Sequence, residues 1–282
     1  MKHARLSNNP LIRITPALEV SRPEAHIERM KILLSNDDGI HARGMAVLHE
    51  SLRPLGSLHV VAPDTERSAA GHAITIFDPI RTMPVDKDNG FSGIAVAGTP
   101  ADCVKLAVSF LHKDAPPDLV VSGINLGSNT GISVLYSGTV SAASEAAILG
   151  VPAIAISLCT YQNPQWETAG KIAAEVVAKV IENPLPDGVL LNVNIPNLPM
   201  DQIKGIRAGQ MGRSRFIEKF TEHRDPRGNY YYWLDGDMKL LDDDAETDER
   251  LVNEGYVSLT PIHIDLTARH CIEQVRAWNA EY

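Results

Sequence analysis

KILLSNDDG at residues 31–39 joins a short apolar strand directly to two aspartates and a glycine. In an open α/β sheet, ligands bind beyond the carboxyl ends of the strands, so Asp37 and Asp38 stand where a ligand site is expected. Two adjacent carboxylates repel each other, and a divalent cation is the simplest partner that makes the pair favourable. The alternative is a polar turn in which an aspartate caps the following helix.

Apolar strands and helices alternate along the chain after this stretch. Thr99 and Pro100 open one of the helices, with an N-cap residue followed by proline in the first turn. This alternation predicts a mostly parallel, doubly wound α/β sheet with right-handed crossovers. Strands are predicted at residues 32–34, 58–62, 94–97, 119–122, 153–157 and 189–195. Helices are predicted at residues 44–52, 100 to about 111, 139–149 and 168–181.

The pattern divides the chain into an extension and one domain. Residues 1–29 combine four arginines, three glutamates and three prolines without periodicity, which predicts a weakly ordered extension. Residues 30–282 are predicted to form the α/β domain, and from about residue 205 its character changes to that of an antiparallel accessory arm, a candidate oligomer contact. In the arm we predict strands at residues 230–234, 256–259 and 262–266, an acidic loop at 241–249 and a terminal helix at 271–278.

Composition restricts the classes of partner and the compartment. The chain has 282 residues and a formal net charge of −9, which argues against polymeric nucleic acid as a partner. Its three widely spaced cysteines fit reduced thiols in a cytoplasmic protein. No apolar run reaches the roughly 18 residues of a membrane span, and the N-terminus lacks the apolar core of a secretory signal.

Polar residues follow two further predicted strands. Ser68 lies in the loop after strand 58–62, where its hydroxyl could contact a cation and the neighbouring Arg67 could contact a phosphate. Asn125 lies just beyond strand 119–122, between glycines, and its side-chain oxygen is a suitable neutral metal ligand. Taken singly, these residues are also typical of helix caps, exposed side chains and turns.

A helix start supplies a candidate phosphate site. Ser137, Gly138 and Thr139 open helix 139–149 and offer backbone N–H groups and hydroxyls to an anion. The alternative is an ordinary capped core helix. If the sheet is parallel, the loops after strands 32–34, 58–62 and 119–122 and this helix start emerge at one edge and can converge.

The types of ligand atom narrow the chemistry further. With only oxygen donors, the predicted set favours Mg²⁺, Mn²⁺ or another hard cation over zinc. A phosphatase of the haloacid dehalogenase type is excluded, because its nucleophilic aspartate would be replaced here by Asn36, and an amide cannot form an aspartyl phosphate.

At these residues the chain resembles the SurE family of metal-dependent 5′/3′-nucleotidases, also called survival protein E. The resemblance extends in order from about residue 30 to 266. The matching segments are KILLSNDDG at 31–39, VVAP at 60–63 with Arg67 and Ser68, GTPADCV at 98–104, SGIN at 122–125, YSGTV at 136–140, DQIKGIR at 201–207, DPRGN at 225–229 and EGYVSLTPIHIDL at 254–266.

The resemblance implies a Rossmann-like α/β/α fold, with C-terminal segments exchanged or packed between subunits of a homodimer or homotetramer. It also implies hydrolysis of nucleoside 5′- and 3′-monophosphates, and in some members of short polyphosphate. The implied ligands of one divalent cation are Asp37, Asp38, Ser68 and Asn125. Two positions depart from the family pattern: Ala69 stands where a glycine commonly follows the serine, and HARG at 41–44 replaces the common HAPG.

Our hypothesis is a cytoplasmic phosphomonoesterase. A cation held by Asp37 and Asp38 would polarise the phosphoryl group and activate water, while Ser137, Gly138 and Thr139 would hold phosphate oxygens and Asn125 would complete the metal shell. One alternative is a regulatory protein that binds nucleotide and metal in the same pocket without turnover. Another is an assembly scaffold built on the C-terminal arm.

Overall fold

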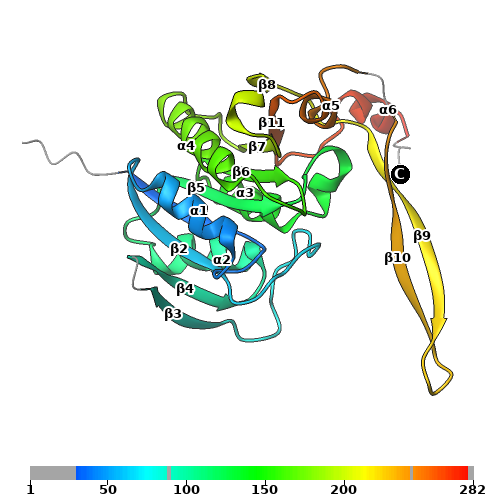
Figure 1. Cartoon of the computed structure of the whole chain (residues 1–282), viewed down its shortest axis with the longest axis horizontal. Coiled ribbons are helices and arrows are strands. Elements are labelled where there is room, and N and C mark those ends of the chain that lie inside the picture. Colours follow the sequence, from blue (N-terminus) through cyan, green and yellow to red (C-terminus); the bar gives the residue numbers. More distant parts are fainter. Residues whose placement is uncertain (1–29, 88–89, 242–243, 279–282) are drawn as a thin grey trace, which may run out of the picture.

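The alternating strands and helices form a nine-stranded sheet with helices on both faces in the computed structural model, which describes residues 30–87, 90–241 and 244–278 (Figure 1). The strand order is β3-β4-β2-β1-β5-β6-β7-β11-β8. Its strands are β1 (Lys31–Ser35), β2 (Ser57–Pro63), β3 (Arg81–Lys87), β4 (Phe91–Ala97), β5 (Leu119–Leu126), β6 (Ala153–Cys159), β7 (Val189–Pro196), β8 (Ile206–Ala208) and β11 (Val257–His263). The predicted extension at residues 1–29 and part of the predicted acidic loop lie outside the described residues.

Six neighbouring strands, from β4 to β7, are parallel, which confirms the predicted α/β class. Their inner positions are almost continuously apolar and buried, as strands covered on both faces require. The main helices are α1 (Arg43–Leu52), α2 (Pro100–Leu106), which continues as a π-helical turn (Ala107–Leu111), α3 (Gly138–Ile148) and α4 (Trp166–Glu182).

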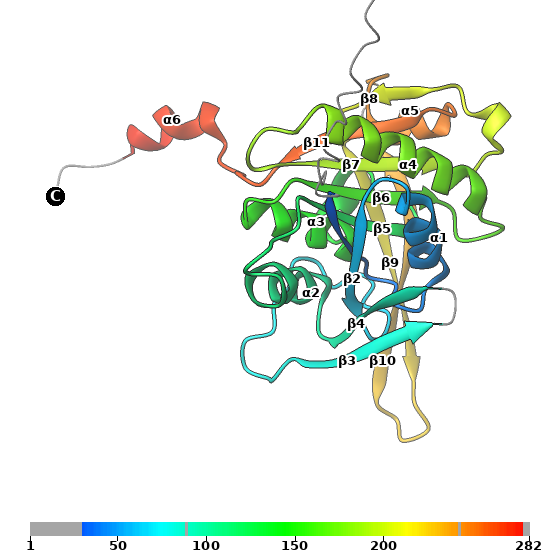
Figure 2. The same cartoon turned by 90° about the vertical axis from the view of Figure 1, so that its left-hand side faces the viewer.

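Two hydrophobic clusters lie on opposite faces of the sheet. Residues of α1 and α4 contribute to one cluster, and residues of α2 and α3 contribute to the other. Figure 2 shows α1 on one side of the sheet and α2 and α3 on the other. The three layers therefore each bury an apolar face, as a doubly wound domain requires.

One crossover departs from the predicted handedness. The connections β5–α3–β6 and β6–α4–β7 advance in the same direction across the sheet, yet α3 and α4 belong to clusters on opposite faces. The β6–α4–β7 connection is therefore opposite in hand to the other parallel crossovers, which obey the usual rule. Because α4 packs against α1, this crossover covers a part of the sheet that the ten-residue α1 alone would leave exposed.

The C-terminal region is only partly an accessory arm. Strand β11 pairs antiparallel with β7 and parallel with β8, so both belong to the central sheet. Strands β9 (Ser214–Arg224) and β10 (Tyr230–Leu240) instead form a separate antiparallel hairpin that projects from the body (Figure 1). Beyond β11, helix α6 (Ile272–Arg276) lies away from the body (Figure 2).

Several element boundaries differ from the sequence-based prediction. The strands predicted at 256–259 and 262–266 are one strand, β11. Its pairing with β8 ends at Leu259, so Pro261 lies at an open edge of the sheet. A proline is tolerated there because its missing N–H removes no hydrogen bond to a neighbouring strand. The end of the predicted acidic loop is helical, in α5 (Asp248–Asn253). Strands β3, β8 and β9 were not predicted. The largely exposed β3 is an edge strand without an apolar period, β8 has only three residues, and β9 pairs only within the hairpin. Three short 3₁₀ segments complete the described elements: Gly131–Leu135, Met200–Gln202 and Arg269–Cys271.

Among the described residues, no helix combines the length and apolar composition that crossing a bilayer requires.

The start of α2 gives a direct stability prediction. Thr99 accepts a hydrogen bond from the backbone N–H of Asp102, whose carboxylate accepts one from the N–H of Thr99. Replacing Thr99→Ala should lower the free energy of unfolding by about 0.5–2 kcal/mol. Thr99→Ser keeps the capping hydroxyl and should retain most of the stability that the cap contributes. Urea unfolding followed by circular dichroism measures both, and equal stabilities of the alanine variant and the wild type would contradict this capping role.

Candidate active site

The predicted aspartates lie at the point where the strand order reverses. Strand β1 pairs with β2 on one side and with β5 on the other, and Ser35 at its end is the register partner of Ser122. Asp37 and Asp38 follow immediately. In open α/β sheets this switch point forms a crevice that binds ligands.

Asp37 is buried against the start of α3. Its carboxylate accepts one hydrogen bond from the hydroxyl of Thr139 and another from the Thr139 backbone N–H. A side chain at Gly138 would collide with it, because a Cβ there would lie 2.7 Å from the Cβ of Asp37. Burial raises the pKa of Asp37 above its ordinary value, although the Thr139 hydrogen bonds act in the opposite direction.

Asp38 is partly buried and contacts the end of β5. Its carboxylate accepts a hydrogen bond from the backbone N–H of Leu126. Burial, followed by the negative charges of Asp37 and Glu66, raises the pKa of Asp38 to about 6. The two aspartates and Glu66 thus concentrate negative charge at the switch point, which favours a bound cation.

The loop after β2 reaches the same place through its backbone. The N–H of Arg67 donates to the carbonyl oxygen of Asp37 at 2.7 Å. The exposed hydroxyl of Ser68 donates to Glu66 at 2.7 Å, and the guanidinium of Arg67 lies 3.6 Å from Asp64. The predicted roles of Ser68 and Arg67 toward metal and phosphate stay predictions, but their loop is in direct contact with Asp37.

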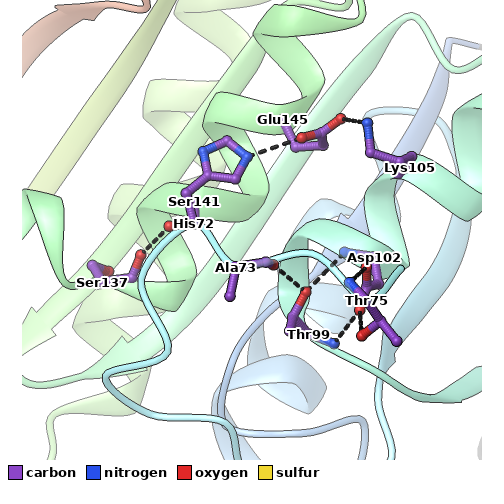
Figure 3. A network of polar contacts seen from close by, with 9 residues as sticks. All are labelled: His72, Ala73, Thr75, Thr99, Asp102, Lys105, Ser137, Ser141 and Glu145. Atoms are coloured by element: carbon purple, nitrogen blue, oxygen red, sulfur yellow. Dashed lines mark hydrogen bonds and ion pairs between the residues drawn. The ribbon is translucent and has the colours of Figure 1, made fainter. Parts of the chain in front are cut away.

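Asp102 holds the continuation of this loop (Figure 3). Its carboxylate accepts hydrogen bonds from the backbone N–H and the hydroxyl of Thr75, and the hydroxyl of Thr99 donates to the carbonyl oxygen of Ala73. Burial alone would raise the pKa of Asp102, but the hydrogen bonds from Thr75 and Thr99 outweigh it and lower the pKa. This carboxylate therefore has a structural environment unlike that of Asp37.

Glu145 of α3 holds the loop from the other side (Figure 3). Its buried carboxylate lies 2.9 Å from Nε2 of His72 and 2.5 Å from Nζ of Lys105. Burial would raise its pKa, yet these two partners outweigh that effect and lower it. The pairing links the Ser68 loop to both α2 and α3.

Asn125 and the start of α3 complete the candidate site. Asn125 lies inside β5 rather than beyond it, because the strand continues to Leu126 after a register shift. Its amide nitrogen donates to the carbonyl oxygen of Gly127 at 2.8 Å, which leaves its Oδ1 for another partner. The hydroxyl oxygen of Ser137 caps α3 by accepting a hydrogen bond from Val140.

The donor set fits a hard divalent cation. The described residues contain no cluster of three or more His, Cys, Asp or Glu side chains suited to a metal, and this candidate set has two carboxylates supplemented by amide and hydroxyl oxygens. Oxygen donors around adjacent carboxylates suit Mg²⁺ or Mn²⁺. Beneath them, the hydroxyls of Ser35 and Ser122 and Oδ1 of Asn36 are buried without a hydrogen-bond partner among the described residues. These buried oxygens near the crevice are thus available to hydrogen-bond a further group.

Two contributors, Glu66 and Leu126, were missed by the sequence analysis, and the contact of Thr139 with Asp37 was not predicted. Glu66 affects the pKa of both aspartates, the backbone of Leu126 binds Asp38, and Thr139 binds Asp37. Thr139 had a predicted role toward phosphate, but no local pattern indicates which carboxylate a helix start will face. An acidic residue two positions before Ser68 was the available signal for Glu66.

Fold and site together define a doubly wound α/β protein with a buried carboxylate pair at the switch point of its sheet. The model of the survival protein SurE family matches residues 32–218. Two similar proteins are both named 5′-nucleotidase SurE. The one from Syntrophobacter fumaroxidans is 46% identical over 250 residues, which cover 89% of this chain and all of the relative. The one from Desulforamulus reducens is 47% identical, covering 88% and 98%.

A solved structure agrees with this match. The crystal structure of the SurE protein from Aquifex aeolicus superposes with a TM-score of 0.77 at 39% identity, covering 88% of this chain and 98% of that one. The chain belongs to the SurE family.

Ala69 gives a prediction about loop strain. It adopts φ +56°, a left-handed conformation that costs an L-residue roughly 1–2 kcal/mol, whereas glycine adopts it freely. Glycine's greater freedom in the unfolded chain offsets part of this relief, so Ala69→Gly should raise the free energy of unfolding by a net amount of about 0.5–1 kcal/mol. Ala70→Gly, the matched control at ordinary φ, should lower it. A destabilised Ala69→Gly variant in thermal or urea unfolding would contradict the strain.

The raised pKa of Asp38 predicts how the stability of the metal-free protein varies with pH. Between its ordinary 3.8 and about 6, the folded state binds more protons than the unfolded state. The free energy of unfolding should therefore fall as pH rises through this window. Asp38→Asn should flatten this dependence and be more stable than the wild type at pH 7. Urea midpoints in EDTA between about pH 4 and pH 7, a range that includes the pKa of about 6, measure this effect, with the exposed Asp114→Asn as control. Parallel profiles for Asp38→Asn and wild type would refute the effect.

Proposed function

We propose that this chain is a divalent-metal-dependent phosphomonoesterase that hydrolyses nucleoside 5′- and 3′-monophosphates to nucleoside and inorganic phosphate. The main support is the convergence on Asp37: the loop after β2 and the start of α3 both contact it, while the end of β5 contacts the adjacent Asp38. Relatives named 5′-nucleotidase over nearly their whole length support the substrate class. Short polyphosphate is a further proposed substrate.

In this proposal Asp37, Asp38, Ser68 and Asn125 hold one Mg²⁺ or Mn²⁺ ion. The bound cation supplies Lewis-acid polarisation of the phosphoryl group and lowers the pKa of water. Thr139 holds the carboxylate of Asp37 in one orientation, so that this ligand needs little rearrangement.

The start of α3 has the proposed second role of binding phosphate oxygens. The positive end of a helix dipole favours an anion, and it is the main support for this role because the N–H groups of Thr139 and Val140 already donate to Asp37 and Ser137. Ser137 and Gly138 stand at this start next to Asp37, and Arg67 is the proposed additional cation for the phosphate. The same groups would stabilise the charge that develops in the transition state.

We also propose a homodimer or homotetramer in the cytoplasm, formed through the β9–β10 hairpin and the C-terminal segment. The hairpin exposes a row of large apolar and aromatic side chains that a partner subunit would cover. These are Ile217, Phe220, Tyr230, Tyr231, Tyr232, Trp233 and Leu234.

Phosphate release tests the proposed activity. The wild type should release phosphate from AMP with Mg²⁺ or Mn²⁺ and stop in EDTA, and 3′-AMP and short polyphosphate extend the same assay. Asp37→Asn should lower kcat at least about 100-fold because it removes an anionic ligand while preserving side-chain shape. Asp114→Asn, the same substitution at an exposed loop position, should change kcat less than about twofold.

Two outcomes would contradict the proposal. Normal turnover by a folded Asp37→Asn variant would remove Asp37 from catalysis. If the wild type releases no phosphate while nucleotide and metal together still raise its melting temperature, the non-catalytic regulatory alternative holds instead.

A further inference from the structure

A cavity of about 640 Å³ lies beyond the carboxyl ends of β5, β6 and β7. The loops that follow these strands line one side, with Ser128, Tyr161 and Asn197, and helix α5 lines the other, with Val252 and Asn253. Its volume is within the range of roughly 300–1,000 Å³ typical of small-molecule sites. The cavity is therefore large enough for a ligand of nucleoside size.

The cavity lies close to the candidate active site, because its lining residue Ser128 follows Asn125 by three positions in the chain. Asn125 donates to the carbonyl oxygen of Gly127, and the Cα of this glycine faces the side chain of Tyr161. A Cβ at Gly127 would come within 2.5 Å of the Tyr161 hydroxyl oxygen and 2.7 Å of its ring, so the glycine allows the tyrosine to lie beside the strand end. A molecule whose phosphate is bound beside Asn125 would thus have the Tyr161 ring within reach.

The wall formed by the loop after β5 is held by buried side chains. The Asn129 backbone N–H donates to Oδ1 of Asn194, and its side-chain nitrogen donates to Ser157, both at 2.8 Å. The carbonyl oxygen of Asn129 accepts hydrogen bonds from the side chains of Asn192 and Asn194. Because these asparagines come from the interior of β7, the loop is held firmly to the sheet.

The wall formed by α5 is tied to the same loop. The carboxylate of Asp248, at the start of α5, accepts hydrogen bonds from the backbone N–H groups of Gly131 at 2.9 Å and Gly212 at 3.0 Å. Asp248 is buried, so this link between α5 and the loop after β5 is shielded from water. Both walls are thus preorganised.

From this geometry we infer that the cavity binds the nucleoside part of the substrate, with the base stacked on Tyr161 and the ribose beside Ser128 and Ser133. The inference rests on the proposed function, which supplies the phosphate position. Tyr161 is 82% exposed, so the ring offers a free face, and every base has a π-face that stacks on an aromatic side chain. The hydroxyls of Ser128 and Ser133 line the same cavity and suit the ribose hydroxyls.

A second cavity, of about 530 Å³, fits this role less well. Residues of α1 and α4 form most of its walls. Lys87 of β3 and Phe91 of β4 complete them, and these strands lie toward the opposite edge of the sheet from β7. None of the residues that directly follow β5, β6 or β7 lines it.

Substrate discrimination tests the inference. For wild type, Tyr161→Leu and Tyr161→Phe, we would measure kcat/KM for AMP and for glycerol 2-phosphate, which has no base. Tyr161→Leu should lower the AMP to glycerol phosphate ratio about fivefold or more, whereas Tyr161→Phe, which keeps the ring, should retain most of it. Phe110→Leu, an exposed aromatic outside the cavity, is the matched control.

Adenosine binding provides a readout independent of turnover. Calorimetry should detect adenosine binding to the wild type and a weaker affinity both in Tyr161→Leu and in Asn253→Trp, which narrows the cavity from α5. If Tyr161→Leu leaves the ratio of kcat/KM for AMP to that for glycerol 2-phosphate unchanged, the inference is overturned, even where both values fall equally. If the wild type hydrolyses neither ester, the proposed function fails. Adenosine binding that depends on Tyr161 would then still support the cavity, and its absence would reject it.

Discussion

The burial of Asp37 against the start of α3 is the constraint on which the rest of the site depends. A carboxylate at the end of a buried strand loses hydration, and the hydrogen bonds from Thr139 return only part of that cost. The close approach requires Gly138, and the backbone of Asp37 in turn holds the loop that carries Ser68. Sheet, helix and loop therefore meet around one charged group, and a cation is the partner that would relieve the repulsion from Asp38.

Four buried or partly buried carboxylates show how environment separates binding groups from structural ones. Asp102 and Glu145 have donors that outweigh burial, so their pKa values are lowered and they remain ionised as supports of the loop between β2 and β3. Asp37 and Asp38 have too few donors, and their pKa values are raised. A raised pKa alone does not mark a binding group, because burial also raises the pKa of Asp248, a structural carboxylate that accepts hydrogen bonds from Gly131 and Gly212. What distinguishes Asp37 and Asp38 is that their raised pKa values coincide with a position in the crevice at the switch point.

The C-terminal region divides into two parts with different physical roles. Strand β11 extends the central sheet beyond β7, and the neighbouring α5 is joined through Asp248 to the loop after β5. This part closes the cavity beside the candidate site. The β9–β10 hairpin instead leaves aromatic side chains exposed, which a chain normally covers with a partner.

The sequence alone determined the α/β class, most parallel strands and the loops of the candidate site, because apolar periods and helix caps are local signals. The capping pattern at Thr99 and the placement of Asp37 after a buried strand required no tertiary information. Only the tertiary structure decided that Thr139 binds Asp37, that α4 crosses to the face of α1 and that Asp248 joins α5 to a distant loop. Those outcomes depend on contacts between residues far apart in the chain, and a local pattern carries no information on which distant group will meet it.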